Sequence, residues 1–84
     1  MKEVHPSEIK TGDYYIQDMG DFILLKKRIR VDNEKQREIW GEYIKILKEP
    51  FKTFKVGATG FSFEGDNKIR WYLLSEGEAM LYMI

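Results

Sequence analysis

The chain contains no cysteine, so neither a disulfide nor a thiolate metal site can stabilise its fold. His5 is its only histidine, and it lies beside a proline near the N-terminus. Without a second histidine or a cysteine, the chain cannot form a Ser-His-Asp triad, a Cys-His pair or a histidine-rich zinc site. We therefore expect a protein that is not an enzyme, with no catalytic residues, no metal and no cofactor.

Neither sign of charge is in excess, because 14 basic residues balance 14 acidic ones. A dedicated nucleic-acid-binding protein usually draws most of its affinity from a basic excess, so this balance argues against that class. It also leaves little self-repulsion, which permits oligomers. No apolar run approaches the roughly 20 residues that span a bilayer, and the N-terminus has no signal-peptide pattern. A cytoplasmic location without a membrane partner is expected.

The 84 residues are enough for a single domain, residues 1–84, with one compact core drawn from 43% hydrophobic residues. The strongest local pattern runs from Phe61 to Leu74. Large apolar residues alternate on both sides of a turn-forming Gly-Asp-Asn: Phe61, Phe63, Ile69, Trp71 and Leu73. This pattern predicts a β-hairpin whose odd-numbered face is core. Its even-numbered face then carries an apolar surface that needs a cover, either the C-terminal tail or another chain.

Two more strands are expected upstream, at Tyr14–Asp18 and Phe22–Val31, joined by a hairpin turn in which Gly20 takes a positive φ. Pro6 can open a short helical turn before them, since its missing N–H is not needed there. Ile9 is the apolar residue able to hold that turn against the core.

The segment 32–49 has two interpretations. As a helix over 33–48 it has capping residues, a broad apolar stripe and Pro50 as a stop. As a strand over 38–47 it has β-branched and aromatic residues, and Gly41 disfavours a helix interior by roughly 1 kcal/mol. We favour the strand because the neighbouring segments form hairpins.

After Leu74, Ser75 and Glu78 have the spacing of a capping box, so the apolar tail Ala79–Ile84 is expected to form a short helix, with a last strand as the alternative. Such a tail should dock on the core or on a partner subunit. The fold predicted is mainly β: an SH3-like or open barrel of about five antiparallel strands with a short C-terminal helix. The alternative is α+β, with residues 33–48 helical.

The opening Ile9-Lys10-Thr11-Gly12-Asp13-Tyr14 resembles the entry to the first strand of small SH3-like barrels. The opening Pro6–Asp13, Pro-Ser-Glu-Ile-Lys-Thr-Gly-Asp, together with the Trp71–Glu76 close, Trp-Tyr-Leu-Leu-Ser-Glu, resembles small accessory proteins of Gram-positive bacteria and their phages. That resemblance implies a regulator, or an inhibitor of a host system. We accordingly expect a small non-enzymatic binding module that acts through a protein partner and forms a homo-oligomer.

Two sets of residues are candidates for the binding surface. Partner-binding roles are expected for aromatic, apolar and arginine side chains typical of protein interfaces: Arg70, Tyr72, Leu74 and Trp40. A first alternative is a barrel that binds single-stranded nucleic acid or another anion through a basic groove: Lys26, Arg28, Arg30 and Lys45. A second is a small-ligand or nucleotide-binding protein whose Val56–Gly60 loop holds an anion.

Overall fold

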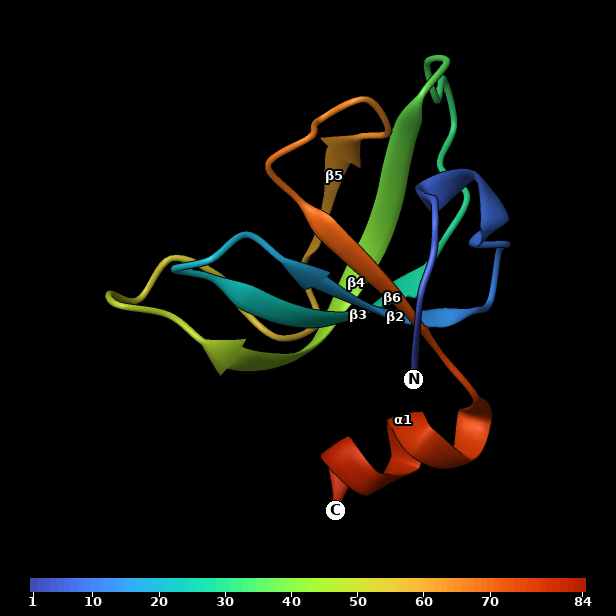
Figure 1. The fold of residues 1–84 in the computed structure, drawn as a ribbon. Helices are drawn as coiled ribbons and strands as arrows, with labels where there is room; N and C mark the ends of the chain where they lie inside the picture. The colour runs from blue at the N-terminus through green and yellow to red at the C-terminus, as the bar shows by residue number, and fades with distance from the viewer.

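One strongly curved antiparallel sheet and one short helix make up the protein, as the computed structural model of residues 1–84 shows (Figure 1). The sheet has six strands in the order β1-β6-β2-β3-β4-β5 and does not close into a barrel. The elements in chain order are β1 (Lys2–Glu3), the 3₁₀ turn η1 (Pro6–Glu8), β2 (Tyr14–Asp18), β3 (Ile23–Arg28), β4 (Glu38–Lys48), β5 (Thr59–Phe63), β6 (Arg70–Leu74) and α1 (Glu76–Met83). The mainly β fold with an open barrel and a short C-terminal helix is confirmed, with six strands in place of about five.

The hairpin between β2 and β3 forms as expected. Its turn is closed by a 2.8 Å hydrogen bond from the Met19 N–H to the Phe22 carbonyl, and Gly20 has a φ of 84°. The predicted 3₁₀ turn at Pro6 also forms, and Ile9 is buried after it. β3 is shorter than expected and ends at Arg28.

β4 is a strand of 11 residues, so the helical interpretation of residues 33–48 is wrong. It lies between β3 and β5 and pairs with both. Two register shifts against β3 mark irregularities in the pairing, and such bulges increase local bend and twist. The backbone pairing with β3 along most of the strand, and with β5 over Glu38–Glu42, outweighs the local helical pattern, because these pairs satisfy the N–H and C=O groups of the strand.

The predicted hairpin from Phe61 to Leu74 does not form. β5 pairs with β4, whereas β6 pairs with β1 and β2 on the other side of the sheet. The linker makes two successive turns, with hydrogen bonds from Asp66 N–H to Phe63 and from Ile69 N–H to Asp66. The turn-forming residues therefore bend the chain across the open side of the sheet, and do not bring the two strands together.

The central strands are buried on both faces. Ile9, Tyr15, Ile39 and Trp71 form the core on the concave face. On the convex face, Ile16, Leu25, Leu74 and Ala79 form a second core between the sheet and α1. Figure 1 shows α1 below the sheet, on the side away from β5. The two-sided burial lets a chain of this size build a core from few strands.

α1 begins with the capping box that its sequence predicts. The Ser75 hydroxyl accepts the Glu78 N–H at 3.2 Å, and the Glu78 carboxylate accepts the Ser75 N–H at 2.9 Å. Ala79 and Tyr82 pack on the sheet, while Met80, Leu81, Met83 and Ile84 are exposed. No helix of this fold has the length and apolar character required to cross a membrane.

Candidate functional site: an aromatic patch at the edge of the sheet

The partner-binding residues expected on β6 do not form an exposed apolar face. Leu74 is only 5% exposed and lies in the core beneath α1, where Tyr72 packs beside it. Arg70 is exposed and forms a bidentate ion pair with Glu3, at 3.0 and 3.1 Å. The C-terminal helix thus covers this face, which was one of the two covers expected from the sequence.

The four basic residues expected to form a groove do not present their charges on one exposed surface. Lys26 is only 1% exposed and lies on the concave side of the sheet. Arg28 is half-buried and contacts Glu34, and Arg30 is exposed beyond the end of β3. Lys45 is held by the Tyr82 carbonyl at 2.6 Å. The fold therefore does not bring these residues together as one anion-binding surface.

The Val56–Gly60 loop has already used much of its hydrogen-bonding capacity. The N–H of Gly57 donates to the Tyr43 carbonyl, and the N–H of Ala58 donates to the Lys55 carbonyl. A phosphate cradle requires such N–H groups to be free and convergent. None of the surface grooves is lined by this loop.

Three aromatic side chains lie together on the outer face of β4 and β5: Trp40, Phe61 and Phe63. The ring centroids of Trp40 and Phe61 are 4.8 Å apart, and those of Phe61 and Phe63 are 5.3 Å apart in an edge-to-face arrangement. Phe61 is 41% exposed and Phe63 56% exposed. We call these three residues the aromatic patch. Trp40 belongs to the predicted partner-binding set, whereas Phe61 and Phe63 were expected in the core.

The position of Trp40 within the patch is set by Glu38. The Glu38 carboxylate accepts the Trp40 indole N–H at 3.1 Å and the Lys35 backbone N–H at 3.0 Å. These two bonds, the backbone one foremost, hold the pKa of Glu38 below its usual value. The indole is therefore anchored by an ionised carboxylate, and the patch has an acidic side chain at its rim.

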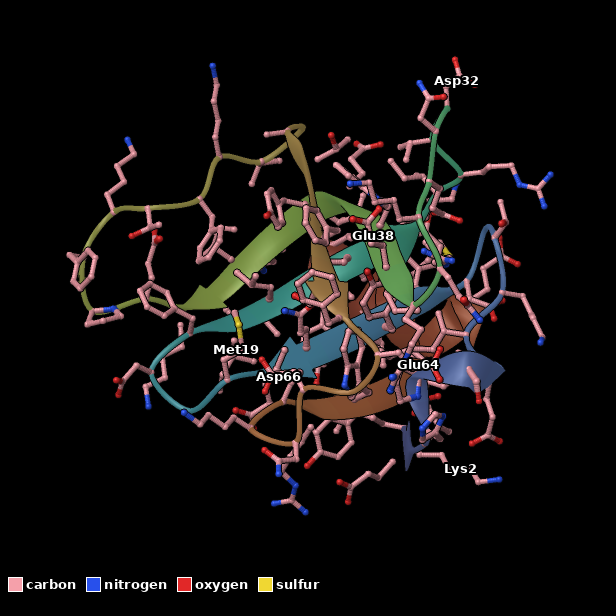
Figure 2. The ribbon with its side chains drawn as sticks, turned by 90° about the horizontal axis from the view of Figure 1, so that it is seen from above. Lys2, Met19, Asp32, Glu38, Glu64 and Asp66 are labelled. Carbon is pink, nitrogen blue, oxygen red and sulfur yellow. The ribbon has the colours of Figure 1, made fainter.

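The patch lies at a free edge of the sheet, because β5 pairs only with β4. Figure 2 shows β5 crossing over β3 and β2, with Glu38 on the β4 side and Glu64 after the end of β5. The sequence of β5 is Thr-Gly-Phe-Ser-Phe, without a charge or a proline. Exposed edge strands are usually protected by such residues. This edge lacks that protection.

Two polar side chains hold the inner face of β5 against the rest of the sheet. Gln17 on β2 donates its amide to the Ser62 hydroxyl at 2.7 Å. Lys26 on β3 donates to the Gln17 carbonyl at 3.2 Å and to the Gly60 carbonyl at 3.4 Å. The concave side of the sheet is thus polar where it supports β5. We call the hydrogen-bonded side chains of Lys26, Gln17 and Ser62 the polar chain, and they position the patch on the opposite face.

The glycines Gly41 and Gly60 face each other across β4 and β5, and Gly41 makes room for Tyr15 and Lys26 whereas Gly60 makes room for Tyr43. A Cβ at Gly41 would lie 2.3 Å from the Tyr15 hydroxyl and 2.9 Å from Lys26. A Cβ at Gly60 would lie 2.1 Å from the Tyr43 hydroxyl. The Lys26 ammonium lies 5.8 Å and 5.1 Å from the ring centres of Tyr15 and Tyr43, within cation–π range. Burial, followed by the charge of Arg28, lowers the pKa of Lys26 to about 8.

The largest surface groove, of about 320 Å³, lies between the N-terminal segment and the β5–β6 loop. Trp71 and Ile69 contribute to its lining, and Glu3, Arg70 and Asp66 contribute charged groups to it. Arg70 and Glu3 neutralise each other there. No three His, Asp or Glu side chains gather anywhere in the structure as a group able to hold a metal ion.

No family model, curated protein or solved structure matches this chain. The sequence did not predict that Phe61 and Phe63 are exposed or that Lys26 is buried. The uncharged composition of Thr59–Phe63, next to two glycines, was the one local hint that this strand is unlike the others.

Proposed function

We propose that this protein is a non-enzymatic binding module that holds a protein partner on the aromatic patch. The observation that carries the proposal is the mutual contact of Trp40, Phe61 and Phe63 at an exposed, unprotected sheet edge. Aromatic side chains dominate the binding energy of protein interfaces, and contiguous exposed apolar surface on a small domain typically marks an interaction site. A regulator or inhibitor of a host system would require a surface of this kind.

The chemistry of the patch indicates the kind of partner surface it accepts. Its centre is apolar, and the ionised Glu38 lies at its rim, with Glu42 on the same strand face two residues beyond Trp40. A partner should therefore offer apolar side chains to the rings and basic side chains to the two carboxylates. Complementary charges of this type raise association rates and select partners more than they add affinity.

A test of the proposal compares one double variant and one single variant that remove aromatic rings in different places. Phe61→Ser with Phe63→Ser removes most of the patch. Phe51→Ser removes a ring that is 66% exposed in the loop after β4, so it serves as the matched control. Proteins cross-linked to the wild-type chain in native host extract should be lost with the patch variant and kept with the control. A partner held equally by the patch variant would contradict the proposal.

One observation favours a second candidate function, the binding of single-stranded nucleic acid. Phe51 is exposed in a loop that also carries Lys52 and Lys55, and Lys48 ends the preceding strand. Exposed rings beside lysines are the usual elements of single-strand binding. Salt-dependent binding of a single-stranded oligonucleotide that is lost with Phe51→Ser, and kept with the patch variant, would select this function over the first.

A further inference from the structure

We propose that the free edge of β5 pairs with the same edge of a second copy of this chain, in an antiparallel arrangement centred on Phe61. The inference rests on the proposed function in one respect: it uses the strand that carries two of the three patch residues. Its central observation is a set of unpaired backbone groups along β5.

The hydrogen bonds at the two ends of the β4–β5 ladder reveal which groups are free. The Glu64 N–H donates to the Arg37 carbonyl, and the Tyr43 N–H donates to the Ala58 carbonyl. In an antiparallel ladder, bonded and non-bonded pairs alternate, so Ser62 and Gly60 also bond to β4. The N–H and C=O of the odd-numbered residues then point away from β4, toward the open side.

These free groups are arranged symmetrically about Phe61. Both of its backbone groups face the open side, flanked by Thr59 on one side and by the Phe63 N–H on the other. The Phe63 carbonyl already accepts the Asp66 N–H at 3.1 Å. With a two-fold axis at Phe61, the Phe61 N–H of each copy donates to the Phe61 carbonyl of the other copy. The same axis also joins each Phe63 N–H to the Thr59 carbonyl of the other copy.

The composition of the strand selects a second copy as the occupant. A charged edge strand would place like charges near each other under two-fold pairing, whereas Thr-Gly-Phe-Ser-Phe has none. In the sheet register, Trp40 lies opposite Phe61. The pairing therefore places four rings in one row across the dimer, Trp40 and Phe61 of one copy beside Phe61 and Trp40 of the other. The zero net charge of the chain adds no long-range repulsion.

The dimer would join the two aromatic patches into one continuous surface. A pairing of five-residue strands buries less than the roughly 800 Å² per partner of a standard stable interface, so the association should be reversible and concentration-dependent. A partner that contacts both patches would gain affinity from the doubled site.

The test is sedimentation velocity of the full chain from about 10 µM to about 1 mM. The wild-type chain should shift from monomer to dimer across this range. Phe61→Pro removes the central N–H and places a ring at the edge, yet breaks no bond to β4. It should abolish the dimer, while the matched Phe61→Ala keeps the N–H and should retain a weakened one. Thr59→Pro keeps all three aromatic rings and the Thr59 carbonyl, but its ring projects from the pairing edge toward the second copy, and this steric obstruction should reduce dimerisation at least tenfold.

Hydrogen exchange supplies a second measurement on the wild-type chain. The Phe61 amide should exchange more slowly at the higher concentration, while the exposed Lys52 amide should not change. A monomer at every concentration would overturn the proposal, as would a dimer that Phe61→Pro and Thr59→Pro leave intact. Loss of the dimer with Thr59→Pro, while the partner is still captured, would separate this inference from the proposed function.

Discussion

Gly41 shows how one missing side chain controls the interior of this sheet. Its α-carbon lies against the Tyr15 hydroxyl and the Lys26 side chain, and neither group can easily withdraw because both are buried. Tyr15 is fully buried and its hydroxyl has no hydrogen-bond partner, so the ring has no free space into which it could move. The glycine that weakens a helical interpretation of this segment is therefore the residue that lets β4 close over the polar chain.

The substitution Gly41→Ala tests this close approach. The added methyl would overlap the Tyr15 hydroxyl, and relief requires the strand or the ring to move, at a cost of about 1 to 3 kcal/mol of unfolding free energy. Gly77→Ala is the matched control, because nothing lies within 4 Å of its added carbon. Urea denaturation should show a clear loss for the first variant and no loss for the second. Equal stability of the two would show that the interior is looser than the contacts indicate.

α1 is the element that decides whether the convex face of the sheet is covered. It has eight residues, too few to be stable as an isolated helix in water. Its position depends on packing of Ala79 and Tyr82 and on the capping box at Ser75 and Glu78. Loss of the cap should therefore expose Tyr72 and Leu74 of β6.

The variant Ser75→Ala should reduce the unfolding free energy by about 0.5 to 2 kcal/mol, because it leaves the Glu78 N–H without its acceptor. Ser75→Asp retains a capping acceptor and should stay close to wild type. Thermal unfolding followed by circular dichroism measures both. If the alanine variant unfolds at the wild-type temperature, the helix is held by packing alone.

At the scale of the whole molecule, the buried Lys26 makes stability depend on pH. Its pKa is lowered from 10.5 to about 8 in the folded chain, so between these values the unfolded chain binds more protons. Stability should therefore rise as the pH increases from about 8 toward 10. Above that range the trend should reverse, because burial raises the pKa of Tyr15 and the folded chain resists its ionisation.

We expect a gain on the order of 1 to 3 kcal/mol between pH 7.5 and pH 9.5 for the wild-type chain. The variant Lys26→Met retains much of the side-chain volume but cannot titrate, so its stability should be flat over this interval. Urea midpoints of both proteins at the two pH values provide the comparison. Parallel pH profiles for the two proteins would show that Lys26 is not the group responsible.

Much of the local structure could be predicted from the sequence. The strand at Tyr14–Asp18, the turn at Gly20 and the cap at Ser75 depend on neighbours within a few residues, so short-range chemistry is sufficient for them. The strand at Glu38–Lys48 was one of two possibilities, because its local pattern also fits a helix. Its neighbours in the sheet settled which one forms.

The candidate site was harder to predict from the sequence than the local structure. Only Trp40 of the aromatic patch was among the predicted partner-binding residues. Alternation of apolar residues shows that a strand has two unlike faces, but it does not show what lies opposite each face. Phe61 and Phe63 were placed in the core on the assumption that their strand pairs with Arg70–Leu74. Since β5 pairs with β4 instead, the same alternation puts the two rings on the outer surface.

The sequence by itself determined that hairpin-forming strands make up much of this chain and that a capped helix follows Leu74, while it left residues 33–48 open between helix and strand. Only the tertiary structure decided that β5 pairs with β4 while β6 pairs with β1 and β2, that Lys26 is buried, and that an aromatic patch remains at a free edge. The physical reason is that strand pairing joins residues distant in sequence. A local pattern specifies the strand, whereas the competition among all available edges specifies its neighbour.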